Sequence, residues 1–79
     1  MTTHLHRRSL LLAGHKTSLA LEPPFWEVLA RCAGAKGLSL AGLISAIDAA
    51  KPLGQPLASA ARLAALDYAL GVSPGGDAA

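Results

Sequence analysis

Polar and apolar side chains alternate between residues 16 and 21, a pattern typical of a β-strand with one covered face. Thr17, Leu19 and Leu21 alternate there with Lys16, Ser18 and Ala20. A period of two places the leucines on one face of the strand and Lys16 and Ser18 on the other. Glu22-Pro23-Pro24 follows and ends the predicted strand, because proline cannot donate to a sheet ladder.

A helix is predicted next, from about Pro24 to Ala35. Proline suits the first helical turn, where its missing N–H costs nothing. A single stripe at helical spacing consists of Phe25, Val28, Leu29, Cys32 and Ala33. Trp26 points about 100° away from Phe25, so we expect Phe25 in the core and Trp26 at its edge or in a subunit interface. Gly37 occupies the place of a left-handed cap that ends the helix.

A second helix is predicted from about Leu40 to Ala50, with Ser39 as its N-cap. Its apolar positions follow the i, i+3, i+4, i+7 pattern of an amphipathic helix and are Leu40, Leu43, Ile44 and Ile47. A third helix is predicted over about Ala58–Leu70, and it carries two apolar lines. One line consists of Leu57, Ala61, Ala64 and Tyr68, and the other of Leu63, Leu66 and Leu70.

These elements divide the chain into a basic N-terminal arm (1–13), a strand-helix-helix core (14–50), a loop (51–56), a third helix (57–70) and a disordered tail (71–79). The loop reads KPLGQP, a cluster of structure-breaking residues. Within the arm, residues 9–12 can extend as a short strand before a turn at Ala13-Gly14. The predicted fold class is therefore mainly α, with one principal β-strand per chain.

A single short strand cannot satisfy its own backbone, so it needs a partner strand. A second copy of the chain is the simplest source, and we expect an intertwined homodimer with a two-stranded antiparallel ribbon. A chain of 79 residues, 52% of them hydrophobic, also has more apolar surface than a small monomer hides well. A two-stranded ribbon fits the major groove of DNA.

The net charge of +2 is small, but its distribution is uneven. The first 20 residues include Arg7, Arg8, Lys16 and three histidines, and they contain no acidic residue. Such a segment can contact phosphate, and Arg7 and Arg8 are the expected phosphate ligands. The alternative interpretation is a solvated tail without a ligand.

Enzymatic chemistry is not expected, because the five carboxylates are scattered and no glycine-rich phosphate loop follows a strand. The histidines His4, His6 and His15 have no acidic or thiol ligand nearby, so no metal or other cofactor is expected. Cys32 is the only cysteine and is expected to pack as a small hydrophobe, which fits a cytoplasmic protein. The apolar run after the twin arginines is interrupted at His15, so we expect neither an export signal nor a membrane segment.

The order of strand, proline-led helix, Gly37-Leu38-Ser39 joint and aliphatic helix resembles the ribbon-helix-helix family of the Arc and methionine repressors. The segment from Gly14 to Asp48 is also similar to small bacterial members with a G-H-[RK]-T-S strand and an E-x-x-F-W helix start. In those members a third helix follows the loop. The resemblance implies an antiparallel ribbon, one strand per subunit, resting on four interlocked helices.

The resemblance also implies roles for individual residues. Strand residues that face away from the helices would touch base edges in double-stranded DNA, and here they are Lys16, Ser18 and Ala20. Backbone amides at the start of the second helix would bind phosphate, at Leu38, Ser39 and Leu40. The implied dimer core consists of Leu19, Leu21, Phe25, Leu29, Leu40, Leu43, Ile44 and Ile47. The expected function is sequence-specific DNA binding by a transcriptional regulator.

Two alternatives remain open at this stage. Ala20 can offer a base only an apolar contact, and the third helix is apolar on two sides, so the chain can also be interpreted as a dimeric protein-interaction module. Its protein partner would then dock on the third helix, with weak or no DNA binding. An antitoxin that binds its toxin through the same helix is the other alternative.

Overall fold

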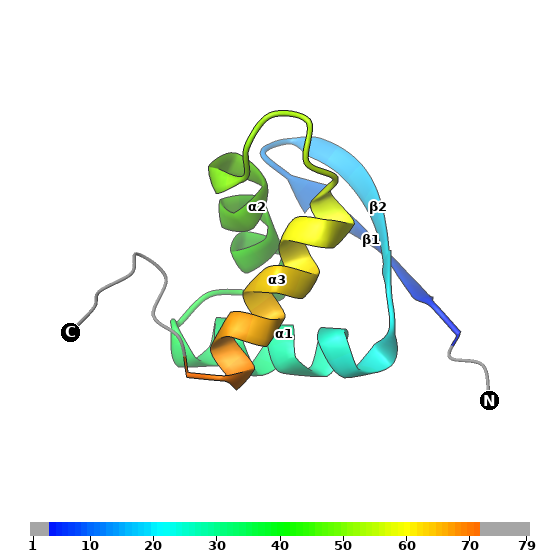
Figure 1. The fold of residues 1–79 in the computed structure, drawn as a ribbon. Helices are drawn as coiled ribbons and strands as arrows, with labels where there is room; N and C mark the ends of the chain where they lie inside the picture. The colour runs from blue at the N-terminus through cyan, green and yellow to red at the C-terminus, as the bar shows by residue number, and fades with distance from the viewer. Residues whose placement is uncertain (1–3, 72–79) are drawn as a thin grey trace.

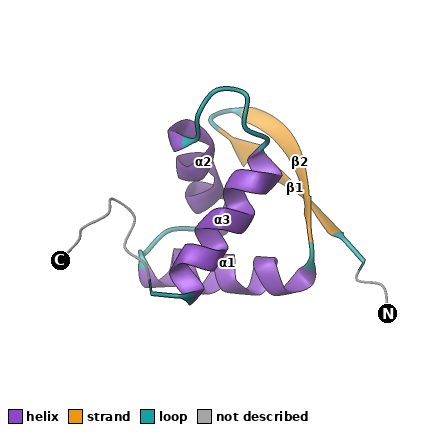
Figure 2. Cartoon of the chain, viewed as in Figure 1, coloured by secondary structure: helices purple, strands orange, loops and turns teal. Residues whose placement is uncertain are grey.

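The computed structural model describes residues 4–71, which form a β-hairpin followed by three helices (Figure 1). The elements are β1 (His6–Leu12), β2 (His15–Leu21), α1 (Pro23–Ala35), α2 (Leu40–Ala50) and α3 (Leu57–Ala69). Figure 2 shows the two strands on one side of the helical part. The predicted tail lies, from residue 72 onward, outside the described residues.

The hairpin is antiparallel, and its two strands are joined by the two-residue turn Ala13-Gly14. Both turn residues have positive φ, +50° at Ala13 and +84° at Gly14. Positive φ at both central residues defines a type I′ turn, whose twist matches that of the flanking strands. The turn therefore fixes the register, with Leu12 opposite His15 and His6 opposite Leu21.

The hairpin corrects two predictions about the N-terminal region. Residues 6–12 form a strand, of which the sequence indicated only residues 9–12, and this strand of the same chain is the partner of β2 that was expected from a second copy. The physical reason is that Leu10 and Leu12 continue a period of two and reach the core, Leu12 being buried and Leu10 half-buried. The charged side chains at the start of this segment obscured that alternation in the sequence.

The observed bounds of the three helices agree closely with those predicted from the sequence. Helix α2 spans the predicted residues, and the Ser39 side chain accepts a hydrogen bond from the amide of Gly42 at 2.9 Å, as an N-cap does. Gly37 has φ +70° in the connection after α1, where the left-handed cap was predicted. Helix α1 begins one residue earlier than expected, and α3 is displaced by one residue toward the N-terminus.

One apolar core lies between the hairpin and the helices. Helix α2 packs against β1, α3 packs against β2, and α1 packs against both other helices. The fully buried large side chains are Leu21, Leu29 and Ile44. Helix α3 contributes only small side chains to the buried core, namely Ala60, Ala61 and Ala65, so it approaches the other elements closely.

Helix α1 corrects the prediction for its two aromatic residues. Trp26 is 4% exposed and belongs to the core, whereas Phe25 is half-buried at its margin. The hydrophobic stripe of α1 is therefore rotated toward Trp26, which packs beneath the start of β1. Cys32 is buried on the same helix, as predicted.

Among the described residues, no single helix is long and apolar enough to cross a membrane. Helices α1 and α2 pass that test only when taken together, and they are bent by 96° at their connection.

Candidate nucleic-acid interface

The hairpin has one face turned away from the helices, here called the outer face. It consists of Arg7, Ser9 and Leu11 from β1 and Lys16, Ser18 and Ala20 from β2. These residues form three directly opposed pairs, Arg7 with Ala20, Ser9 with Ser18, and Leu11 with Lys16. All six side chains are exposed except that of Ala20, which is half-buried.

The three strand residues predicted to face bases lie together on this outer face. Lys16 and Ser18 are exposed, and Ala20 follows at the next position on the same side of β2. The leucines between and beyond them, Leu19 and Leu21, are buried on the opposite face. The period of two in the sequence thus predicted the orientation of β2 correctly.

Sequence reasoning did not place Arg7 on this surface, although the chain contains the signal that locates it. A two-residue turn at Ala13-Gly14 pairs Leu12 with His15 and therefore pairs Arg7 with Ala20. Arg7 thus stands directly across from the one predicted base-facing position that has no polar group. The same register adds Ser9 opposite Ser18.

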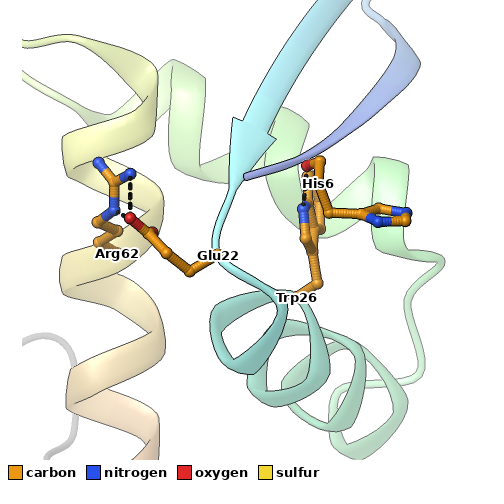
Figure 3. A network of polar contacts seen from close by, with 4 residues as sticks. All are labelled: His6, Glu22, Trp26 and Arg62. Carbon is orange, nitrogen blue, oxygen red and sulfur yellow. Dashed lines mark hydrogen bonds and ion pairs between the residues drawn. The ribbon is translucent and has the colours of Figure 1, made fainter. Parts of the chain in front are cut away.

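Arg8 points to the opposite face of the hairpin, so the two predicted phosphate ligands Arg7 and Arg8 do not share one surface. The Arg8 guanidinium lies over the Trp26 ring, 5.1 Å from its centroid, in a cation–π arrangement. The Trp26 Nε1–H also donates a 2.7 Å hydrogen bond to the carbonyl oxygen of His6 (Figure 3). Through these two contacts, Trp26 links the first residues of β1 to α1.

The predicted phosphate ligands at the start of α2 are only partly available. The Leu38 amide donates to the carbonyl oxygen of Ala33 at 2.8 Å, so it is already engaged in ending α1. The amides of Ser39 and Leu40 make no hydrogen bond within the described part of the chain. The positive end of the helix dipole therefore has unpaired donors at these two residues.

The residues predicted to form a dimer core pack within one chain. The buried ones are Leu19, Leu21, Leu29, Leu43 and Ile44, and the half-buried ones are Phe25, Leu40 and Ile47. The second group leaves apolar surface on α1 and α2 open. A hollow of about 240 Å³ lies nearby, with Leu43, Ile47 and Ala64 among its lining residues.

No acidic residue belongs to the outer face, and its two cations are not used in ion pairs within the described residues. In the described residues, the ion pairs are Arg62 with Glu22 and Lys51 with Asp48. Arg62 binds Glu22 with two hydrogen bonds, of 2.9 and 3.2 Å (Figure 3). These bonds, joined by a backbone hydrogen bond at Glu22, hold the pKa of that carboxyl below its ordinary value. Arg7 and Lys16 take no part in either pair.

Comparison with known families assigns the architecture. The family model described as a ribbon-helix-helix domain matches residues 5–69, which cover both strands and all three helices. The chain belongs to the ribbon-helix-helix domain family. No curated protein and no solved structure shows a significant match. Ribbon-helix-helix domains are in general DNA-binding regulators and are typically homodimeric.

The match to this ribbon-helix-helix family begins at residue 5, so it includes β1. Because β1 pairs with β2 in the same chain, each chain contains a complete two-stranded ribbon. Side chains from two strands therefore share the outer face, where a single strand would supply only three. This difference determines which residues are candidates for contact with nucleic acid.

Proposed function

We propose that this protein is a sequence-specific DNA-binding protein, a cytoplasmic transcriptional regulator that inserts its hairpin into the major groove of double-stranded DNA. The proposal rests on one observation, the composition of the outer face of the hairpin. Arg7 and Lys16 stand there with two serines between them, without a carboxylate on that face and with the helices on the other side. The membership in a family of DNA-binding regulators supports the same conclusion.

The dimensions of the hairpin suit this role. Two paired strands are about 5 Å apart, and the major groove is about 12 Å wide, so a ribbon and its side chains fit inside it. Lysine donates to the O6 and N7 atoms of guanine, and a serine hydroxyl both donates and accepts hydrogen bonds. Lys16 and Ser18 are therefore the proposed base contacts from β2, and Ala20 offers its methyl group to thymine.

Phosphate binding is the proposed role of the amides of Ser39 and Leu40. They are unpaired donors at a helix N-terminus, where the dipole also favours an anion. Contacts of this kind orient a protein on the duplex but do not read its sequence. Leu38 is left out of the proposed site because its amide is engaged with Ala33.

A homodimer is the proposed active form. Leu40 and Ile47 are only half-buried in one chain, and the hollow beside α2 has an almost entirely apolar lining. A second copy that covers this surface removes apolar area from water, which stabilises association. Two hairpins in one complex would contact two half-sites, so the DNA target is expected to be a repeated or palindromic sequence.

Fluorescence anisotropy with labelled duplex DNA tests the proposal. The wild-type protein is expected to bind its own upstream region more tightly than sheared DNA, and affinity is expected to fall steeply as salt is raised. Lys16→Ala should weaken specific binding by at least about fivefold. Arg31→Ala is the control, because it removes one positive charge from the exposed surface of α1, outside both the hairpin and the start of α2. Absence of binding at low salt would exclude the proposed function.

A second candidate function is protein binding through α3, and one observation favours it. Leu63, Leu66 and Leu70 form a line at helical spacing, and their side chains are 53%, 49% and 68% exposed. Leu66→Lys should abolish association with a stoichiometric protein partner and leave the fold intact, because the side chain is not part of the core. The second function would be established if the wild-type protein bound no DNA and if Leu66→Lys abolished its association with a purified partner.

A further inference from the structure

We propose that Arg7 is the residue that determines base specificity in this protein, by donating two parallel hydrogen bonds to a guanine in the major groove. This inference rests on the proposed DNA-binding function and goes beyond it, because it names the residue and the base. Arg7 would then contact a base and not a phosphate group. Both strands of the hairpin, β1 as well as β2, would contribute base contacts.

The first step is the position of Arg7 on the hairpin. Its direct cross-strand partner is Ala20, whose side chain is a single methyl group. Directly opposed side chains lie about 5 Å apart, so a large residue at position 20 would compete with Arg7 for the same space. With alanine there, the cross-strand neighbour does not block the long arginine side chain, which is free to extend from β1 toward the groove.

The second step is the anchoring of the residues on either side of Arg7. The His6 carbonyl oxygen accepts the 2.7 Å hydrogen bond from Trp26, and the Arg8 guanidinium stacks 5.1 Å from the same ring. Trp26 is itself only 4% exposed. Because successive strand residues point to opposite faces, the placement of the Arg8 side chain over Trp26 means that the Arg7 side chain points away from α1.

The third step is chemical. Arginine presents a rigid fork of donors that matches the O6 and N7 acceptors of guanine, and this is the commonest specific contact of proteins with DNA. Arg7 makes no ion pair within the described residues, so no internal carboxylate has to be displaced first. Arg8 has the same chemistry but is held over Trp26 on the other face, and it does not reach the groove.

The geometry of the hairpin also separates the two cations of the outer face. The pair Arg7–Ala20 and the pair Leu11–Lys16 are four residues apart along the strands. At about 3.4 Å per residue, this spacing corresponds to roughly four base pairs of about 3.4 Å each. Arg7 and Lys16 are therefore expected to act on different base pairs, about four steps apart.

Selection of binding sites from a randomised duplex library, with the full-length protein and its variants, tests the inference. The wild type is expected to select a guanine that Arg7→Ala no longer selects, with the preference over other bases falling roughly 5- to 150-fold. Arg7→Lys keeps the positive charge but not the fork. It should retain the salt dependence and the affinity for random DNA, and lose most of the guanine preference.

Arg8→Lys is the matched control and should leave the selected sequence unchanged. If Arg7→Lys selects the same sequence as the wild type while Arg7→Ala only weakens binding to all sequences, Arg7 is a phosphate contact. That result would overturn this inference and leave the proposed function standing. If the wild type binds no duplex at low salt, the proposed function itself fails and the inference fails with it. Circular dichroism of each variant verifies that the fold is retained.

Discussion

The two faces of the hairpin are built from alternating residues of the same two strands, yet their environments are opposite. The covered face holds Leu12, Leu19 and Leu21, all buried against the helices. The outer face holds two cations, two serines and Leu11, all exposed. The comparison shows that the same hairpin contributes apolar side chains to the core on one face and presents a polar surface on the other. Within each strand, alternate residues take the two roles, and the two-residue turn sets which residues of β1 match those of β2.

The neighbouring residues Arg7 and Arg8 illustrate this division most clearly. Their side chains are chemically identical, and the sequence alone suggests one shared phosphate-binding role. In the structure Arg8 stacks on Trp26, whereas Arg7 stands opposite Ala20 on the other face. The register of a two-residue turn thus separates an anchoring residue from one that is free to meet a ligand.

The largest expected effect comes from shortening a covered-face leucine. Leu21 is fully buried, so Leu21→Ala removes apolar contacts and leaves a cavity, and it should lower the free energy of unfolding by about 2–5 kcal/mol. Urea denaturation followed by circular dichroism measures the loss. In a domain of this size, such a change is a large part of the total stability.

Leu11→Ala is the matched substitution on the outer face. Its side chain is 66% exposed, so the free energy of unfolding should change by no more than about 0.5 kcal/mol. A loss for Leu11→Ala comparable to that for Leu21→Ala would mean that the outer face is covered in solution. The distinction between the two faces would then fail.

A smaller effect is expected at the contact that joins the hairpin to α1. Trp26→Phe removes the Nε1–H donor to the His6 carbonyl and weakens the attraction for Arg8, and it should cost about 1–2 kcal/mol. Hydrogen exchange should speed up most at the amides of β1, because that strand loses its anchor. Arg8→Ala is the control, since it removes the cation–π contact and keeps the hydrogen bond.

If Trp26→Phe destabilised the protein without faster exchange in β1, Trp26 would act only through core packing. The orientation of Arg7 would then depend on the turn and the sheet register alone.

The turn that sets the register provides a third test, with an effect of about 0.5–1 kcal/mol. Ala13 has φ +50°, a left-handed conformation that a residue with a Cβ adopts reluctantly, so Ala13→Gly should stabilise the hairpin. Gly14→Ala should destabilise it by a similar amount. An added Cβ at Gly14 meets no atom within 4 Å, so the cost there is conformational alone. Thermal unfolding of both variants measures the opposite signs.

Should both variants shift stability in the same direction, the turn would not have the two positive φ values found here. The pairing of Arg7 with Ala20 would then lose its basis.

Much of the fold could be predicted from local signals. Ser39 as an N-cap, Gly37 as a left-handed position and the stripe of α2 are each set by interactions within a few residues, and each was predicted correctly. The alternation in β2 was also sufficient to orient Lys16 and Ser18. These features depend on short-range geometry, which the sequence pattern expresses directly.

The features that were missed depend on contacts between distant residues. The burial of Trp26 in place of Phe25 follows from the position of β1, twenty residues earlier in the chain. The sequence indicated a short strand at residues 9–12 but not its extension to His6 or its pairing with β2, because the two arginines in β1 interrupt the apolar pattern that its inward leucines continue. The Ala13-Gly14 turn was recognised, but its consequence for the position of Arg7 required the register.

The smallest expected effect lies outside the hairpin, at the ion pair that ties the end of β2 to α3. The Arg62 hydrogen bonds lower the pKa of Glu22, so the pair stabilises the fold above the ordinary glutamate pKa of about 4.3. This contribution is lost as pH falls through that value and then through the lowered one. Glu22→Gln should therefore be less stable than the wild type at pH 7, and the difference should shrink toward zero in acid. Glu27→Gln, which alters a carboxylate outside both ion pairs of the described residues, is the control. A difference between Glu22→Gln and wild type that does not change with pH would mean that Arg62 acts on Glu22 through packing, and that charge contributes nothing to this joint.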